Sequence, residues 1–105
     1  MSGAGTLLSL CATNEVPEGG ALKVERDGLI LAVFNLGNQF YVTDDTCTHG
    51  PGSLSEGEIF DDVIECNFHQ GQFCIRTGEA VLAPCTEPVK TYPASVREGR
   101  VVIEV

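Results

Sequence analysis

Both histidines of this chain lie close to a cysteine, in two short segments that are 16 residues apart. The first segment is Cys47-Thr48-His49, and the second is Cys66-Asn67-Phe68-His69. Two thiolates and two imidazoles make a complete set of four ligands for a metal centre. A chain with this pattern has to fold so that the two segments meet, and this requirement constrains its architecture more than any other feature of the sequence.

The distribution of the four side chains bears on the kind of metal. Zinc sites with two Cys and two His usually take the cysteines from one segment and the histidines from the other. Here each segment supplies one of each, as a two-iron cluster requires when both segments must reach both irons. In one class of [2Fe–2S] cluster, two histidines replace two cysteines on one iron. The spacing therefore favours a [2Fe–2S] cluster, with a tetrahedral zinc site as the alternative.

The residues around these segments resemble those of the Rieske ferredoxins of bacterial aromatic-ring dioxygenase systems. The resemblance covers nearly the whole chain, and its matching stretches are residues 47–50, 54–57, 65–71, 77–78, 83–84 and 90–93. It implies one Rieske-type [2Fe–2S] cluster, with Cys47 and Cys66 on one iron and His49 and His69 on the other.

Short apolar segments rich in β-branched and aromatic residues alternate with turn signals, and none has a convincing helical period. Hairpin turns are predicted at Asp27-Gly28, Gly37-Asn38 and Glu98-Gly99. The pattern indicates an all-β fold, an antiparallel sandwich or barrel with little helix. The predicted strands are residues 6–10, 21–25, 29–35, 40–44, 63–66, 72–75, 80–82, 91–97 and 101–105.

The resemblance adds a more specific architecture, the Rieske [2Fe–2S] fold. It implies a small cluster-binding subdomain with two ligand loops, at about residues 45–57 and 65–74. A third, proline-containing loop at about residues 83–88 joins them at one tip of the molecule, where the histidines lie outermost.

The length of 105 residues suits one domain, and we expect residues 1–105 to form a single Rieske ferredoxin domain. The N-terminus lacks the basic and apolar regions of a signal peptide. The longest apolar run, residues 29–34, has about a third of the length of a membrane helix. These features predict a soluble, cytoplasmic protein that does not associate with membranes.

Three further cysteines, Cys11, Cys74 and Cys85, lie outside the expected ligand set. An odd number in a chain without an export signal argues against a disulfide framework. We expect all three to be small buried apolar residues without a ligand role. The alternative for Cys85 is a position close to the cluster, because the resemblance implies that the loop after Pro84 packs against the metal site.

The net charge of −9 disfavours nucleic acids and anionic membranes as partners, because both require a cationic surface. No Lys or Arg occurs between Asp27 and Ile75. This stretch is either a solvated face that keeps the protein soluble or a negative surface that steers a basic partner. Its acidic residues near the first ligand loop are Asp44, Asp45, Glu56, Glu58, Asp61, Asp62 and Glu65.

The ligand set and its surroundings also bear on the redox potential. Two ferric ions, two sulfides and two thiolates sum to zero charge, so such a cluster accepts an electron more readily than one with four thiolates. High-potential Rieske proteins have two further cysteines, a Ser and a Tyr near the cluster, where this chain has Gly52, Phe68, Gly71 and Phe73. Fewer hydrogen-bond donors predict a midpoint at the low end of the Rieske range, about −150 mV.

The resemblance implies an electron carrier that takes single electrons from an NADH-dependent flavoprotein ferredoxin reductase. It would deliver them to the terminal oxygenase of an aromatic-ring dioxygenase. We do not expect an enzyme, because both histidines are committed to the cluster and no strand is followed by G-x-G-x-x-G. The alternative is a small Rieske subunit held permanently in an oxidoreductase such as assimilatory nitrite reductase. The acidic stretch favours transient partners and a monomeric protein.

Overall fold

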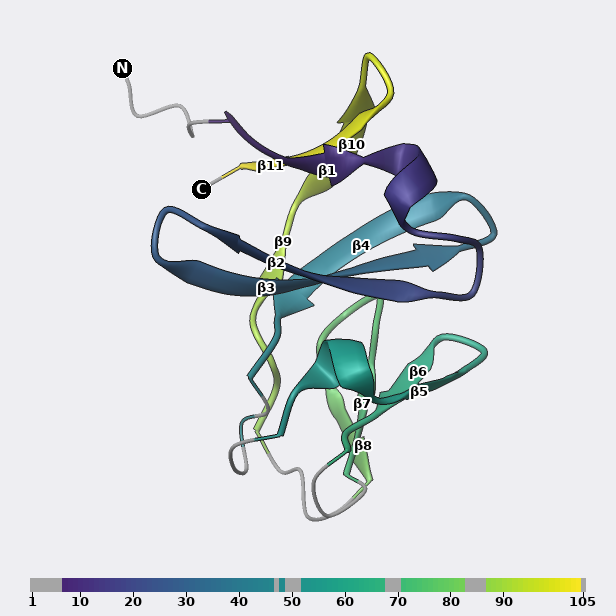
Figure 1. The fold of residues 1–105 in the computed structure, drawn as a ribbon. Helices are drawn as coiled ribbons and strands as arrows, with labels where there is room; N and C mark the ends of the chain where they lie inside the picture. Colours follow the sequence, from purple (N-terminus) through teal and green to yellow (C-terminus); the bar gives the residue numbers. More distant parts are fainter. Residues whose placement is uncertain (1–6, 47, 49–51, 68–70, 83–86, 105) are drawn as a thin grey trace.

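The computed structural model describes residues 7–46, 48, 52–67, 71–82 and 87–104, which form three antiparallel sheets (Figure 1). The first sheet has the order β1-β11-β10, from β1 (Leu7–Ala12), β10 (Ala94–Arg97) and β11 (Arg100–Glu104). The second has the order β2-β3-β4-β9, from β2 (Ala21–Arg26), β3 (Leu29–Leu36), β4 (Gln39–Asp44) and β9 (Thr91–Tyr92). The third has the order β5-β6-β7-β8, from β5 (Glu58–Phe60), β6 (Val63–Glu65), β7 (Gln72–Cys74) and β8 (Ala80–Leu82).

Helical structure in the described ranges is confined to two 3₁₀ segments, η1 (Thr13–Glu15) and η2 (Leu54–Glu56). Neither is long or apolar enough to span a membrane, and the described part of the chain contains no other helix. The expected all-β architecture with little helix is therefore confirmed.

The second sheet is the middle layer of the molecule, and β3 is its most buried strand. Successive side chains of a strand point to opposite faces of the sheet. Leu31 and Val33 pack into a core shared with the first sheet, whereas Ala32 and Phe34 pack into a second core under the third sheet. All four are completely buried. Residues 31–34 of the apolar run are thus explained by a strand that is covered on both faces, whereas Ile30 is 45% exposed.

The two cores divide the molecule into a base and a cluster-binding region. We define the base as the first two sheets, whose shared core includes Leu10, Val24, Val42 and Ile103. We define the cluster-binding region as η2 and the third sheet with the loops that connect them. Its core against the second sheet includes Leu54, Ile64, Cys66, Phe73, Ile75 and Val89. Figure 1 shows this region below the middle sheet, on the side opposite the first sheet.

The three predicted hairpin turns all form, and each has both central residues at positive φ. The angles are 50° and 78° at Asp27 and Gly28, 60° and 69° at Gly37 and Asn38, and 53° and 77° at Glu98 and Gly99. Two consecutive left-handed residues match a type I′ turn, whose twist suits an antiparallel hairpin. Local turn chemistry therefore sets the register of β2 with β3, β3 with β4, and β10 with β11.

Two strand predictions were wrong. Residues 91–97 do not form one strand: β9 pairs with β4 in the second sheet, and β10 pairs with β11 in the first. Pro93 lies at the break, because proline has no N–H to donate to a ladder. No strand was predicted at β5, a three-residue segment that begins with the charged Glu58 and is followed directly by Asp61 and Asp62.

Candidate metal centre

The structure describes one of the four expected ligands. Cys66 lies in the described ranges, whereas Cys47, His49 and His69 lie outside them. The flanking residues Thr46, Thr48, Gly52 and Asn67 are described, so the course of both ligand segments up to the centre can be followed. Among the described residues alone, no three candidate ligands come together.

Cys66 directly follows β6 and is 1% exposed. Its backbone N–H donates to the carbonyl of Gly71 at 2.7 Å, which closes the second ligand loop at its base. The thiol packs with Leu54, Ile64 and Phe73 in the core of the cluster-binding region. The second sheet and η2 thus hold this ligand position from one side.

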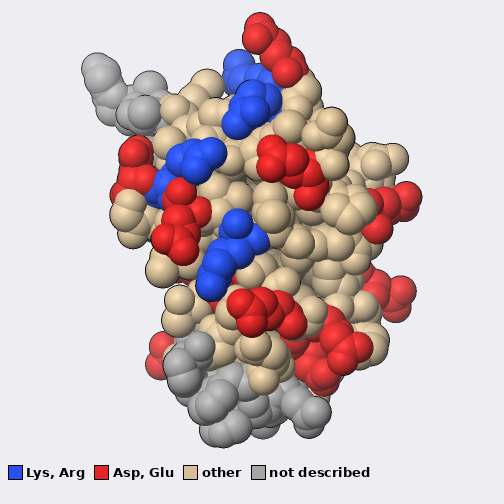
Figure 2. Space-filling model, in the orientation of Figure 1, with Lys and Arg blue, Asp and Glu red and all other residues tan. Residues whose placement is uncertain are grey.

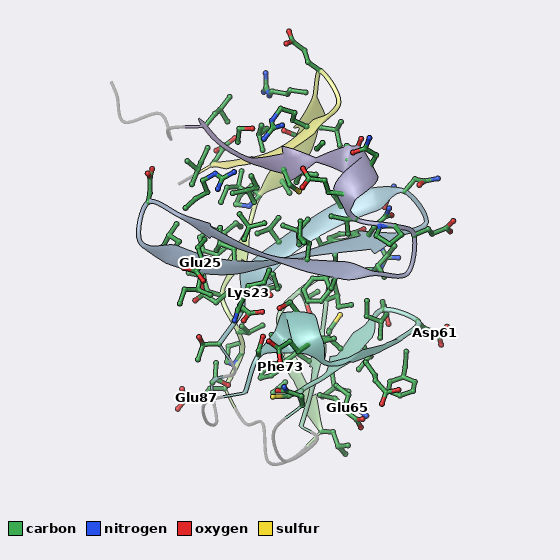
Figure 3. All side chains as sticks on the ribbon, viewed as in Figure 1. Lys23, Glu25, Asp61, Glu65, Phe73 and Glu87 are labelled. Carbon is green, nitrogen blue, oxygen red and sulfur yellow. The ribbon has the colours of Figure 1, made fainter. Side chains whose placement is uncertain are left out.

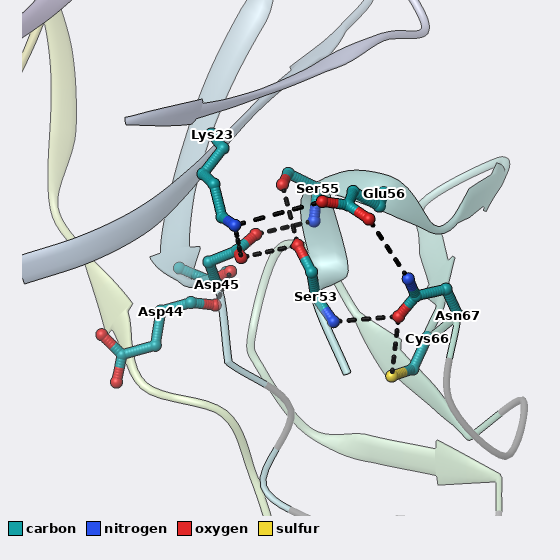
Figure 4. A network of polar contacts seen from close by, with 9 residues as sticks. Lys23, Asp44, Asp45, Ser53, Ser55, Glu56, Cys66 and Asn67 are labelled. Carbon is teal, nitrogen blue, oxygen red and sulfur yellow. Dashed lines mark hydrogen bonds and ion pairs between the residues drawn. The ribbon is translucent and has the colours of Figure 1, made fainter. Parts of the chain in front are cut away.

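The first ligand loop is closed by Asp45, which lies just before it. The Ser53 hydroxyl donates to Asp45 Oδ2 at 2.6 Å, and the backbone N–H of Ser55 donates to Asp45 Oδ1 at 2.8 Å (Figure 4). The carbonyl of Asp45 accepts from the backbone N–H of Leu54 at 2.8 Å, and Thr46 forms a β-bridge with Ser53. These bonds bring the two ends of the loop together.

Asn67 connects the two ligand loops. Its Oδ1 accepts the backbone N–H of Ser53 at 2.9 Å, and its Nδ2 donates to Glu56 Oε1 at 3.4 Å (Figure 4). The same Oδ1 lies 4.0 Å from Cys66 Sγ. The loop that carries Cys66 is therefore fixed directly to the loop that carries Cys47 and His49.

The third loop, expected at about residues 83–88, is described only at its end. The Thr48 hydroxyl of the first ligand loop donates to the carbonyl of Glu87 at 3.0 Å. After this point, the chain is tied to the third sheet by the Val89 N–H, which donates to the Gly78 carbonyl at 2.8 Å. The end of the third loop thus contacts the first ligand loop, as the resemblance implied. Residues 83–86, including Cys85, lie outside the described residues.

The acidic stretch is less uniform than its sequence indicated, because β2 supplies a cation to it. Lys23 Nζ lies 3.8 Å from Asp45 Oδ2 and 4.0 Å from Glu56 Oε2, and Figure 3 shows its side chain extending from β2 toward η2. Asp45 was expected at the acidic surface, and this was wrong, since it is 2% exposed and held by its hydrogen bonds.

Two further acids of the stretch have partners that sequence reasoning missed. Asp62 forms an ion pair with Arg76 at 3.6 Å. Asp44 accepts a 2.6 Å hydrogen bond from the Tyr92 hydroxyl. Burial, together with this hydrogen bond and the nearby negative charge of Asp44, raises the pKa of Tyr92 to about 12. Such pairings join residues that are far apart in the chain, and no local signal announces them.

Glu58 and Asp61 remain as exposed acids that pair with no other described residue. On the face shown in Figure 2, the charged side chains in the lower part of the molecule are acidic, and the Lys and Arg side chains lie above them. A net negative surface near the ligand loops therefore persists.

The remaining cysteines differ in burial. Cys11 is 3% exposed in the core of the base, and burial is the main reason why the pKa of its thiol is raised. This agrees with the expectation of a small buried apolar residue. Cys74 is only half-buried, which departs from that expectation.

Phe73 is completely buried beside Cys66 in the same core and carries no hydroxyl group. It therefore offers no O–H donor to a group bound at Cys66. Gly71, whose carbonyl accepts from the Cys66 N–H, has no side chain and therefore offers no hydroxyl either. Both observations agree with the low potential expected from the sequence, which stays a prediction.

The chemistry of these residues fits a two-iron cluster. One thiol is buried at the base of one loop, and a neighbouring loop that carries a thiol and an imidazole is fixed to it through Asn67. A centre bound from two loops needs both of them to be held in place, and the bonds of Asp45 and Asn67 supply this. Zinc sites usually take both cysteines from one segment and both histidines from the other, so the presence of one cysteine and one histidine in each loop favours the cluster.

Comparison with known proteins agrees with this conclusion. The family model of the Rieske [2Fe–2S] domain matches residues 6–93. The biphenyl dioxygenase ferredoxin subunit of Pseudomonas sp. (strain KKS102) is 48% identical over 99 residues, which are 93% of this chain and 90% of that protein.

Solved structures extend the comparison to the fold. A chain of the complex of reduced oxygenase and oxidized ferredoxin in carbazole 1,9a-dioxygenase matches with 45% identity and a TM-score of 0.88, over 93% of this chain and 92% of that one. A putative NADPH nitrite reductase small subunit matches with a TM-score of 0.81 over 93% of this chain and 97% of that one. Its identity is 18%, so this likeness extends to the fold alone.

The chain therefore belongs to the Rieske [2Fe–2S] family. Within it, this chain is a ferredoxin of the type found in aromatic-ring dioxygenase systems, an electron-transfer protein with one Rieske cluster and not the catalytic component.

Proposed function

We propose that the protein carries single electrons from an NADH-dependent flavoprotein ferredoxin reductase to the terminal oxygenase of an aromatic-ring dioxygenase. The observation that carries this proposal is the joining of two ligand loops beside a buried Cys66, in a chain with 48% identity to a dioxygenase ferredoxin subunit. The solved complex of a related ferredoxin with its oxygenase supports the oxygenase as a partner.

The ligands of the cluster are proposed to be Cys47 and Cys66 on one iron and His49 and His69 on the other. The bound cluster supplies one-electron chemistry, since its irons exchange an electron without bonds being made or broken. The role of the chain is to keep the ligand positions fixed. Asp45 and Asn67 provide this through hydrogen bonds within and between the loops.

The surface near the loops is proposed to meet its partners transiently. Glu87 is exposed, and its carbonyl accepts from Thr48 of the first ligand loop, whereas Asp61 lies at the far end of the β5–β6 hairpin (Figure 3). Exposed charges of this kind speed encounters more than they strengthen complexes. We infer that the protein acts as a single-domain monomer in the cytoplasm.

Reconstitution tests the proposed route. The purified ferredoxin is combined with an NADH-dependent ferredoxin reductase and a terminal oxygenase, and NADH-dependent formation of the dihydroxylated product is followed. Product should appear only when all three components are present. Absence of product with several reductase and oxygenase pairs, each active with its own ferredoxin, would contradict the proposal.

A charge variant tests the transient encounter. Glu87→Lys should slow reduction by the reductase about threefold at low ionic strength, and added salt should remove the difference. Glu18→Lys is the matched control, because Glu18 is also exposed but lies in the loop before β2. Equal rates for both variants at low salt would leave the acidic residues as a solubilising face only.

Gel filtration distinguishes the shuttle from a permanent subunit. A ferredoxin that meets its partners transiently should elute alone as a stable coloured monomer. A subunit of a nitrite reductase type of enzyme should instead co-elute with a large partner when purified from its source.

A further inference from the structure

The side chain of Asn67 is placed unusually for a residue next to a metal ligand, because it contacts the opposite loop through both ends of its amide. Ser53, which donates to Oδ1, is 14 residues away in sequence, and Glu56, which accepts from Nδ2, is 11 residues away. Neither contact would form unless the two ligand loops lay side by side. Asn67 thus links the two loops through its side chain.

The hydrogen-bond partners fix the orientation of this amide. A backbone N–H can meet only the oxygen of the amide, and a carboxylate can meet only its nitrogen. Rotating the amide by half a turn would set two donors against each other at Ser53 and two acceptors against each other at Glu56. The bridge is therefore selective for an Asn side chain at this position.

The bridge does not end at Glu56. The other carboxylate oxygen of Glu56 lies 4.0 Å from Lys23 Nζ, and Lys23 lies 3.8 Å from the buried Asp45. Asp45 in turn accepts from Ser53, whose N–H donates to Asn67. These five residues form a closed ring of contacts that includes both ligand loops and one strand of the base (Figure 4).

We propose that Asn67 is a positioning residue for the cluster, and that its amide bridge keeps the two ligand loops from separating. This inference rests on the proposed ligand role of Cys66 and does not depend on which redox partners the protein serves. A loop that swings away exposes its ligands to water and to competing chelators. The bridge should therefore control how fast the cluster is lost and how uniformly its ligands are held.

The test follows bleaching of the oxidised holoprotein in excess chelator. Asn67→Ala removes both bridging bonds and should speed bleaching about tenfold, which corresponds to about 1.4 kcal/mol. The electron paramagnetic resonance spectrum of the reduced protein should broaden, because its ligands sample more positions. Asn14→Ala is the matched control, since Asn14 is exposed on η1 in the base and should bleach at the wild-type rate.

If the Asn67→Ala protein does not assemble a cluster, a second pair of variants tests the proposal by exchanging the amide and the carboxylate between positions 67 and 56. Asn67→Asp alone places a second carboxylate next to Glu56 and should also bleach about tenfold faster. The double variant Asn67→Asp with Glu56→Gln restores a donor and an acceptor in reversed order, and its rate should return to within about twofold of wild type. Lack of rescue, or wild-type bleaching and spectra in Asn67→Ala, would overturn the proposal.

Discussion

The base and the cluster-binding region are both antiparallel sheets, but they are held together in different ways. In the base, β3 pairs with β2 and with β4 over six residues each. In the cluster-binding region, no strand is longer than three residues, and β7 pairs with β8 through only two residue pairs with a shift between them. Strands this short contribute few ladder bonds, so the region depends on its loops and on its contact with the second sheet.

The two cores also differ in whether they contain a proposed metal ligand. The base core is built mostly from aliphatic residues on the strands of two sheets, and none of its described members is a proposed ligand. The second core contains a proposed metal ligand, Cys66, among its buried members. Metal binding is therefore expected to stabilise the cluster-binding region directly and the base only indirectly.

The first prediction concerns the ligands. Replacing Cys66 by Ser, or His69 by Ala, should abolish the cluster, because a two-iron centre that loses one protein ligand is exposed to hydrolysis. Amides of β5 to β8 should then exchange hydrogen faster, whereas those of β3 should stay protected, since the base keeps its own core. Iron and sulfide analysis and hydrogen exchange measure the two effects.

Cys74→Ser is the control for the ligand variants, since Cys74 is half-buried and belongs to no proposed ligand set. It should leave the iron and acid-labile sulfide content unchanged. A colourless Cys74→Ser protein would contradict the ligand assignment. Equal loss of protection in both regions of the Cys66→Ser protein would show that base and cluster-binding region unfold as one unit.

The second prediction concerns two glycines. A Cβ at Gly57 would lie 1.9 Å from the carbonyl oxygen of Glu65, which is backbone and cannot rotate away. Gly57→Ala should destabilise the protein by about 3 kcal/mol and reduce its cluster content. At Gly28, φ is +78° but nothing lies within 4 Å, so Gly28→Ala should cost only about 1 kcal/mol. Urea unfolding compares them, and similar losses would mean that β6 can shift to accept the extra atom.

The third prediction concerns Phe73 and the redox potential. Phe73→Tyr adds a hydroxyl group to the core that contains Cys66. A hydrogen bond from this hydroxyl should stabilise the reduced cluster more than the oxidised one, because the reduced cluster is more negative. The midpoint should rise by about 60 mV, equivalent to a tenfold change in a one-electron equilibrium. Direct electrochemistry provides the value for both proteins. A drop in stability with an unchanged midpoint would show that the new hydroxyl faces away from the cluster.

The fourth prediction concerns Tyr92, which belongs to the base. Its pKa is raised from 10.0 to about 12 in the folded protein, so its stabilising effect is complete below pH 10 and is lost as the pH rises toward 12. Tyr92→Phe should cost about 1 kcal/mol at neutral pH and flatten the fall in unfolding free energy between pH 10 and 12. Urea titrations across that range test it, and an unchanged slope would contradict the assigned pKa.

Much of the base could be predicted from the sequence because its determinants are local. The residues Gly37-Asn38 alone predict a hairpin turn, and the apolar run at residues 29–34 alone predicts a strand. The run could not reveal that β3 is covered on both faces, because periodicity alone does not separate a buried strand from other buried segments. The break at Pro93 could have been found, since proline argues against a continuous paired strand.

The candidate site was predictable only in its ligands. The spacing of Cys and His predicted Cys66 and the three other expected ligands, but it did not predict the residues that hold the loops in place. Asp45 resembled a surface acid, Lys23 lies on a distant strand, and Asn67 looked like a spacer between ligands. Their roles depend on long-range contacts, which a single sequence does not encode in any recognisable pattern.

The pairing of β1 with β11 has a practical consequence for building fused redox chains. Leu7 lies opposite Glu104, at the end of the molecule away from the ligand loops (Figure 1). A flexible linker attached before Leu7 or after Glu104 would therefore leave the loops unobstructed. Short flexible linkers give effective concentrations in the millimolar range. Electron transfer from a reductase tethered at either position would be intramolecular, so its rate would no longer depend on the protein concentration.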